Sequence, residues 1–441
     1  MSDGTAAPAP AAPPTIRAAL QHRPFRALLA GGTVYFVGSA MQGMATAWLV
    51  IEQTGSSFLA ALVQTALFLP MFVMSLPAGV LADTTDRRRM ILGALIVQAL
   101  LVALLTLGVA GGWAGAGLLL VLTFLIGSCT AVLSPPWNSA IVDVVPREQL
   151  PQAITAISIA YNLARALGPA LAGALYAWAG GGWVFALALL GVVALFESVR
   201  RHPPRPHPPS RLPPERLWGG MLSGLRFVRH SDVVLAQLLR ISAYCGAGAA
   251  LWALLPVIGQ QRLGLGATGF GFLIGCMGTG AVIAGFVVGR VRSRWGLERL
   301  VGAGSLVFAA VMAVAAVSRH AVVVYVALLA AGASWLAVTS TYNTATQTSV
   351  PPWVRARATA LHTLSALGAF ALGSAFWGAV SDLLNLTAAL LLAAAALAGS
   401  VMLARRFPLR GGELHEVTQA TLREFLRPGE QVTMQHYIAE R

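Results

Sequence analysis

The chain has 441 residues and a formal net charge of +14, and 57% of its residues are hydrophobic while only 10% are charged. Soluble domains carry about 25% charged residues, so this composition excludes an ordinary soluble protein and indicates an integral membrane protein. The positive charge does not indicate nucleic-acid binding, because the arginines lie in short segments between long apolar runs.

The first 24 residues are rich in alanine and proline and lack the charged, apolar and cleavage regions of a signal peptide. We expect residues 1–24 to form a disordered cytoplasmic N-terminus.

Twelve apolar runs follow, and each is long enough to match or exceed the roughly 20 residues that an α-helix needs to cross a hydrocarbon core. Backbone groups in lipid must bond within their own segment, so such runs form helices. Their expected bounds are 25–51, 57–82, 90–111, 115–144, 151–178, 181–199, 232–260, 267–289, 299–318, 320–349, 355–381 and 385–404. The sequence therefore predicts an all-α membrane protein with twelve transmembrane helices.

A charged turn, residues 79–89, joins the second and third runs. Gly79 allows two helices to approach closely, Asp83 supplies an anion at a helix end, and Arg87 and Arg88 follow at a fixed offset. One interpretation is that this turn only fixes topology, as any basic loop would. The other is that it forms part of a gate.

Arginines occupy alternate connections between the apolar runs. They are Arg17, Arg23, Arg26, Arg87 to Arg89, Arg147, the group within 200–229, the group within 290–299, Arg355, Arg357 and those from Arg405 onward. The opposite connections hold only Arg262 and Arg319. This asymmetry predicts that both termini lie in the cytoplasm.

A proline- and arginine-rich segment, residues 200–231, divides the runs six and six. We expect it to be a stiff cytoplasmic linker between bundles at 25–199 and 232–405, with a cytoplasmic tail at 406–441 that contains an amphipathic helix near 414–426. The halves repeat each other, since Gly168 and Gly173 recur 205 positions later as Gly373 and Gly378. The sequence thus predicts two pseudo-symmetric six-helix halves around a central cavity.

The charged turn resembles the G-x-L-x-D-R-x-G-R-R loop of the major facilitator superfamily. Gly79, Leu81, Asp83, Arg87 and Arg88 match that pattern, whereas Thr84 and Asp86 depart from it.

Residues 138–173 resemble the branch that includes the bacterial enterobactin exporter and transmembrane secretion effector proteins, and this likeness covers about residues 20–405. Within that stretch, Gly168, Pro169 and Gly173 are similar to a drug-antiporter motif, with Ala172 as a departure. The resemblance implies export, driven by the proton gradient. The alternative for these small residues is helix packing alone, with bending at the proline.

Several polar side chains within the runs are candidates for lining the cavity. Arg165 lies near the middle of its run and either pairs with an acid such as Asp143 or attracts an anionic substrate. Arg240, with Tyr244 one turn later, is a second candidate, although simple snorkelling to the interface is the favoured interpretation. The remaining candidates are Tyr35, Gln42, Gln64, Asn162, Asn343 and Gln347, and bonding between helices is their alternative role.

Proton coupling requires a titratable group, yet no acid lies in the middle of a run. Glu52 and Asp143, at run ends, are the candidates, with His362 as a titrating alternative. We expect Asp83 to hold the cytoplasmic gate, near Arg355 and Arg357 at the start of the eleventh run.

The sequence contains no nucleotide-binding G-x-x-x-x-G-K-[ST] pattern, no metal-ligand cluster and no nucleophile–base set, so we expect neither an enzyme nor a cofactor. The main hypothesis is a monomeric secondary transporter in the bacterial inner membrane that exports a small amphipathic molecule, either a siderophore or a drug-like compound. The alternatives are a nutrient importer of the same fold and a non-transporting receptor or scaffold that acts through its tail.

Overall fold

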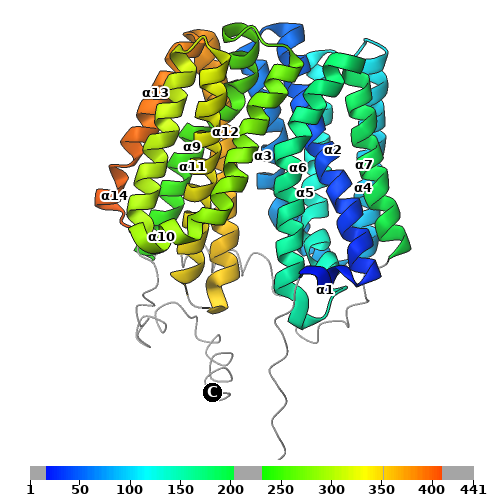
Figure 1. Cartoon of the computed structure of the whole chain (residues 1–441). Coiled ribbons are helices and arrows are strands. Elements are labelled where there is room, and N and C mark those ends of the chain that lie inside the picture. The colour runs from blue at the N-terminus through cyan, green and yellow to red at the C-terminus, as the bar shows by residue number, and fades with distance from the viewer. Residues whose placement is uncertain (1–15, 203–230, 351, 410–441) are drawn as a thin grey trace, which may run out of the picture.

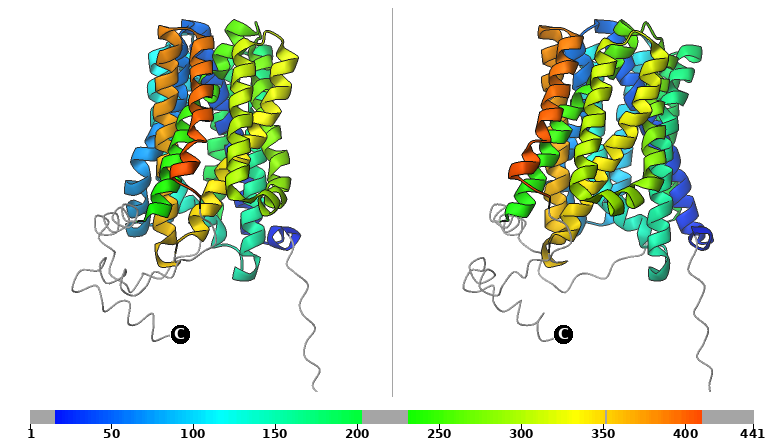
Figure 2. Two further views of the ribbon diagram at one scale, coloured as in Figure 1. Left: turned by 90° about the vertical axis from the view of Figure 1, so that its left-hand side faces the viewer. Right: turned by 60° about the vertical axis from the view of Figure 1, so that its left-hand side comes forward.

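The computed structural model describes residues 16–202, 231–350 and 352–409, and the regular structure in these ranges is entirely helical. The long helices run nearly parallel in one upright bundle (Figures 1 and 2). They are α1 Ile16–Leu20, α2 Arg23–Thr54, α3 Ser57–Thr84, α4 Arg87–Ala110, α5 Ala116–Val142, η1 Arg147–Gln149, α6 Leu150–Ala179, α7 Gly181–Arg201, α9 Asp232–Val257, η2 Ile258–Arg262, α10 Ala267–Val317, α11 Ala321–Thr348, α12 Pro352–Leu383, α13 Leu386–Ser400 and α14 Leu403–Arg406.

Ten helices in the described ranges are long and apolar enough to cross a membrane, so the chain is a multi-pass membrane protein. Helix α6 is not among the ten, because polar side chains such as Ser158 and Arg165 lower its hydropathy. Helix α10 counts once although it has 51 residues, and Gly296 interrupts it with φ of 75°. Only glycine adopts this backbone conformation readily. The connection expected near 290–298 is therefore reduced to a one-residue break.

The described chain becomes helical earlier than predicted. Residues 16–24 were expected to be disordered, but α1 lies across the lower end of the bundle in Figure 1. Ala19 is fully buried, and His22 Nε2 lies 3.0 Å from Gln149 Oε1. Burial and this polar contact hold the segment in place. The rest of the expected N-terminus, at 1–15, most of the linker, at 203–230, and the tail at 410–441 with its expected helix lie outside the described residues.

The helices form two groups, which Figure 1 shows on the right and the left. The N-terminal group is α2 to α7 and the C-terminal group is α9 to α14; most packing is within each group. The largest contacts between groups join α3 to α12 and α6 to α10. We call the end where α2 begins the lower end, and the end where α2 finishes the upper end.

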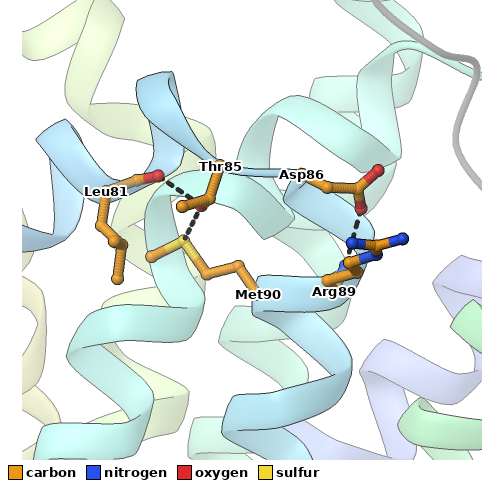
Figure 3. Close-up of a pocket in the computed structure, with 5 residues that line it drawn as sticks. All are labelled: Leu81, Thr85, Asp86, Arg89 and Met90. Carbon is orange, nitrogen blue, oxygen red and sulfur yellow. Dashed lines mark hydrogen bonds between the residues drawn. The ribbon is translucent and has the colours of Figure 1, made fainter.

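The charged turn at the lower end forms without the glycine of the G-x-L-x-D-R-x-G-R-R pattern, where this chain has Asp86. Helix α3 continues to Thr84, and Asp86, with φ of −63°, caps α4 by accepting a hydrogen bond from the backbone N–H of Arg89 at 2.8 Å (Figure 3). An aspartate is a favoured N-cap because its carboxylate satisfies a free N–H of the first turn. This turn borders an open pocket of about 450 Å³ lined by Leu81, Thr85, Asp86, Arg89 and Met90.

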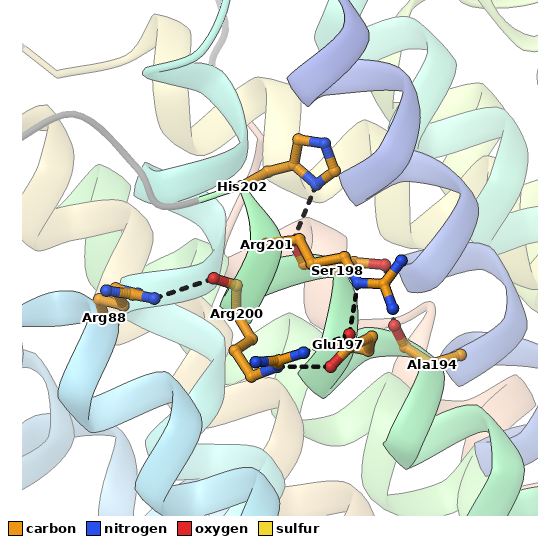
Figure 4. Close-up of polar contacts among 7 residues, drawn as sticks. All are labelled: Arg88, Ala194, Glu197, Ser198, Arg200, Arg201 and His202. Atoms are coloured by element: carbon orange, nitrogen blue, oxygen red, sulfur yellow. Dashed lines mark hydrogen bonds and ion pairs between the residues drawn. The ribbon is translucent and has the colours of Figure 1, made fainter.

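Basic side chains of the charged turn bind the N-terminal group itself. Arg87 Nη1 lies 3.2 Å from the Asp143 carboxylate, and Arg88 Nη2 donates to the carbonyl oxygen of Arg200 at 2.9 Å. Glu197 accepts from both Arg200 and Arg201, as Figure 4 shows with the Arg88 contact. These bonds tie α4 to α5 and α7 at the lower end.

Candidate functional site

The two groups meet most closely at glycines near the upper end. A Cβ on Gly173 of α6 would lie 2.5 Å from the carbonyl oxygen of Ala267, and one on Gly378 of α12 would lie 2.4 Å from the Cβ of Ala61. Both distances are below any normal contact, so only glycine allows these backbones to approach. Thr65 Oγ1 of α3 also donates to the carbonyl oxygen of Ala371 at 2.8 Å.

An acid of the C-terminal group caps a helix of the N-terminal group at the upper end. The Asp382 carboxylate accepts from Ser56 Oγ at 2.7 Å and from the backbone N–H of Ser57 at 2.8 Å. Ser57 begins α3, so the carboxylate faces the positive end of that helix dipole. This contact joins α12 to α3 across the boundary between groups.

Farther down, α6 carries an exposed polar face. Ser158, Tyr161 and Arg165 are all exposed and lie at spacings of three and four residues, which places them on one side of the helix. Exposed leucines such as Leu163 and Leu167 occupy the other side. The guanidinium of Arg165 lies 5.8 Å from the Tyr161 ring centre and 5.7 Å from that of Trp252, which belongs to the C-terminal group.

Aromatic rings extend this contact through both groups. Trp252 packs edge-on to Trp335 with centroids 5.9 Å apart, and Trp335 lies 5.8 Å from Phe370. Phe370 in turn lies 5.0 Å from Phe68, which returns the series to the N-terminal group. We call this set the aromatic chain; its members are Phe36, Tyr161, Trp252, Trp335, Phe370 and Phe68, with Tyr244 and Phe308 packed on Trp335. It presents stacking surfaces where the groups meet.

The sequence interpretation named Arg165 beside this set and Tyr244 within it, but missed the other rings of the aromatic chain. Tyr161 had a usable signal, because it precedes Arg165 by four residues and so shares its helix face. Trp252 and Trp335 lie deep within their helices, whereas tryptophan is enriched at membrane interfaces. That unusual depth was a signal for function.

Other predicted cavity residues are placed within one group. Tyr35 is buried and bonds Gln98 and Thr130, each at 3.3 Å. The candidates in the lower halves of α6 and α11 form hydrogen bonds within their own helices. Asn162 Nδ2 donates to the carbonyl oxygen of Ser158, and Gln347 Nε2 donates to Asn343 Oδ1. Gln42 is buried and Gln64 is half-buried.

One predicted role of each of two arginines was wrong, while attraction of an anionic substrate by Arg165 stays a prediction. Arg165 does not pair with Asp143, because Asp143 accepts from Arg87 and the Arg165 guanidinium lies near the rings of Tyr161 and Trp252. Arg240 does not snorkel to the interface. It is 2% exposed and binds both carboxylate oxygens of Glu298, at 2.6 and 2.9 Å. A bidentate acid from α10 makes burial of the charge feasible.

The comparisons with known proteins cover most of the chain. A family model described as transmembrane secretion effector matches residues 15–435. The chain belongs to the transmembrane secretion effector family. Its sequence is 28% identical over 395 residues to the multidrug efflux pump Tap of Mycobacterium tuberculosis, covering 84% of this chain and 90% of that protein.

Two further relatives match over shorter stretches. The macrolide efflux protein A of Streptococcus pyogenes is 25% identical over 238 residues, covering 54% of this chain and 59% of the relative. The enterobactin exporter of Shigella boydii serotype 4 is 26% identical over 285 residues, covering 61% of this chain and 64% of the relative. The chain is therefore a transporter of the major facilitator superfamily.

Solved structures agree in fold. A nucleoside transporter aligns with a TM-score of 0.71 at 12% identity, covering 87% of this chain and 99% of that one. A bacterial homologue of the lysosomal transporter Spinster aligns with a TM-score of 0.64 at 16% identity, covering 87% and 94%. At these identities the likeness concerns the fold.

In this secretion effector, the candidates for coupling lie apart from one another. Glu52 is exposed at the upper end and accepts from the Tyr176 hydroxyl. Asp143 pairs with Arg87 at the lower end, and His362 is 5% exposed with a ring nitrogen 3.2 Å from Thr346 Oγ1. Each therefore has a protein partner, and the three do not form a cluster.

The gate candidates and the motif glycines of the secretion effector have different neighbours. Gly79 and Asp83 belong to α3, at positions whose surroundings lie outside what the structure describes. Arg355 is exposed and Arg357 is half-buried on α12. A Cβ on Gly168 would lie 2.8 Å from that of Ala40 in the same group, whereas the carbonyl oxygen of Pro169 faces Gly271 of the other group. The motif thus serves packing both within and between groups.

Proposed function

We propose that the chain is a secondary active exporter of a small amphipathic molecule and that it works by alternating access. The observation that carries this proposal is the aromatic chain, which spans both groups and adjoins the exposed face of α6 at Tyr161 and Arg165. Stacking surfaces with a few polar groups suit amphipathic ligands. Relatives named as multidrug, macrolide and enterobactin exporters support the direction of transport.

We further propose twelve crossings in two repeated halves, 25–199 and 232–405. The break at Gly296 divides α10 into two segments, and α6 with 30 residues is long enough for a crossing of its own.

Equivalent packing supports the repeat. Gly168 packs on Ala40, and the residues 205 and 206 positions later, Gly373 and Gly246, pack on each other in the same way. The contact of Gly173 with Ala267 likewise corresponds to that of Gly378 with Ala61, with the roles of the halves exchanged.

The lower end is proposed to face the cytoplasm of a bacterial cell, with the chain in the inner membrane and both termini inside. Arg87, Arg88, Arg200 and Arg201 lie at this end, whereas Arg262 and Arg319 lie at the upper end. Arginine is retained on the cytoplasmic side of membranes.

Two gates would then alternate. The contacts at Asp382, Gly173 and Gly378 close the upper end, so this conformation is proposed to face inward. Closure of the lower end would bring Asp83 toward Arg355 and Arg357. The same proposal includes proton coupling through Glu52, Asp143 or His362. It also includes operation as a monomer and the absence of a nucleic-acid partner.

Transport by purified protein in liposomes tests this function. We expect a pH gradient to drive net movement of an amphipathic dye such as ethidium or 1-anilinonaphthalene-8-sulfonate, and an uncoupler to abolish it. Trp335→Ala should reduce the rate at least fivefold because it interrupts the aromatic chain. Trp178→Ala is the matched control, since Trp178 is 86% exposed at the upper end. Transport of neither dye, or equal loss in both variants, would contradict the proposal.

A further inference from the structure

Arg165 lies near the middle of α6 and, among the described residues, lacks the acid partner that two other helical arginines, Arg87 and Arg240, have. Arg240 has both oxygens of Glu298, and Arg87 has Asp143. Within the described ranges of the chain, no carboxylate lies at ion-pair distance from Arg165. A cation at this depth, about 14 residues into α6, normally faces a partner or a functional cavity. The site therefore holds positive charge that the described protein does not neutralise.

The surroundings of Arg165 select the shape of its partner. The guanidinium lies near the rings of Tyr161 and Trp252, at 5.8 and 5.7 Å from their centres. Tyr161 is 45% exposed, so part of this side chain remains accessible beside the charge. A planar, conjugated ligand can stack on such a ring while its anionic group meets the guanidinium.

Trp252 supplies an independent observation. Its indole Nε1 is buried and has no acceptor among the described residues. An indole N–H can only donate, and a buried donor without an acceptor is costly. The unused donor and the unpaired guanidinium belong to side chains that contact each other, so both point to a ligand that carries acceptor oxygens.

We propose that Arg165, Tyr161 and Trp252 form the subsite for an anionic aromatic substrate, with Arg165 binding its carboxylate, phenolate or catecholate oxygens. Trp252 Nε1 donates a hydrogen bond to the same group, and Tyr161 stacks on the conjugated ring. This inference rests on the proposed export function and names its substrate class. It also places the recognition residues on both groups, because Trp252 belongs to α9 and Tyr161 to α6.

Binding to the full chain in lipid nanodiscs tests the charge preference. The probes are 2-naphthoate and 2-naphthylmethylammonium, which share a ring system and differ in charge, and titration calorimetry measures both. We expect the wild type to prefer naphthoate at least tenfold. Arg165→Gln should lose most of that preference, Arg165→Lys should keep part of it, and Trp252→Phe should weaken naphthoate binding severalfold while leaving the cation unchanged.

Two controls separate recognition from folding. Arg319→Gln removes an exposed upper-end arginine and should bind both probes as the wild type does. Elution volume and helical circular dichroism of each variant exclude misfolding. A wild type that prefers the cation, or an Arg165→Gln variant that retains the naphthoate preference, would overturn the assignment.

Transport measurements separate this inference from the proposed export function on which it rests. Pumping of ethidium, together with naphthoate binding that Arg165→Gln leaves unchanged, would refute the anionic subsite and leave export intact. Naphthoate binding that depends on Arg165, in liposomes that move neither probe, would refute the export proposal and retain the subsite.

Discussion

The Asp382 carboxylate, at the end of α12, lies 2.8 Å from the backbone N–H of Ser57, the first residue of α3. Since the two residues belong to different helix groups, the hydrogen bond must break whenever the upper end opens. Its contribution is therefore specific to the closed state, unlike that of bonds within one group.

Asp382→Asn is expected to favour opening of the upper end. The amide keeps one acceptor but loses the charge that faces the α3 dipole, and a hydrogen bond to a charged group contributes about 1.5 kcal/mol, or roughly tenfold in the equilibrium. A cysteine at Ala61, in a background without native cysteines, should then react faster with an impermeant maleimide added from outside. Asp232→Asn, at an exposed lower-end acid, is the control. Equal labelling in both variants would refute this role.

Asp83→Asn is expected to weaken the outward-facing state by about 1 kcal/mol, because an anion near the N-terminus of α12 is favoured by the helix dipole. A cysteine at Ser158, on the exposed face of α6, should be labelled more in inverted vesicles. Asp86→Asn serves as the comparison, since asparagine is also a good N-cap. Unchanged transport together with unchanged labelling would exclude Asp83 from the gate.

Gly271→Ala should destabilise the crossing of α6 and α10. The new Cβ would lie 2.3 Å from the carbonyl oxygen of Pro169, so the backbones must separate, at a cost of about 1–3 kcal/mol. We expect a lower melting temperature in detergent and reduced transport. Gly117→Ala is the control, because a Cβ there has nothing within 4 Å and alanine is the better helix former. A Gly271→Ala protein as stable as Gly117→Ala would disprove the close crossing.

Arg240→Met should destabilise the protein by about 1–3 kcal/mol. The change leaves the Glu298 carboxylate without its bidentate partner, and the 35% exposure of Glu298 places the effect below that of a fully buried pair. Adding Glu298→Gln should recover part of the loss, as measured by thermal unfolding. The comparison is Glu197→Gln, whose exposed ion pairs predict a loss below about 1 kcal/mol. No recovery in the double variant would mean that the two residues are not energetically coupled.

The sequence by itself determined the membrane class, the apolar helices and the small residues of the helix crossings. Long uncharged runs have no soluble alternative, and Gly173 and Gly378 mark positions where a side chain is excluded. It also identified Arg165 as unusual, because charge within an apolar run is costly wherever its partner lies.

Only the tertiary structure decided the partners. Arg240 meets Glu298, 58 positions away, and Arg165 meets Trp252, 87 positions away, since 252 − 165 = 87. Helical periodicity assigns a residue to a face of its own helix but does not say which helix that face will meet. The aromatic chain draws on α2, α3, α6, α9, α10, α11 and α12, so its assembly depends on how the groups pack and not on any local pattern.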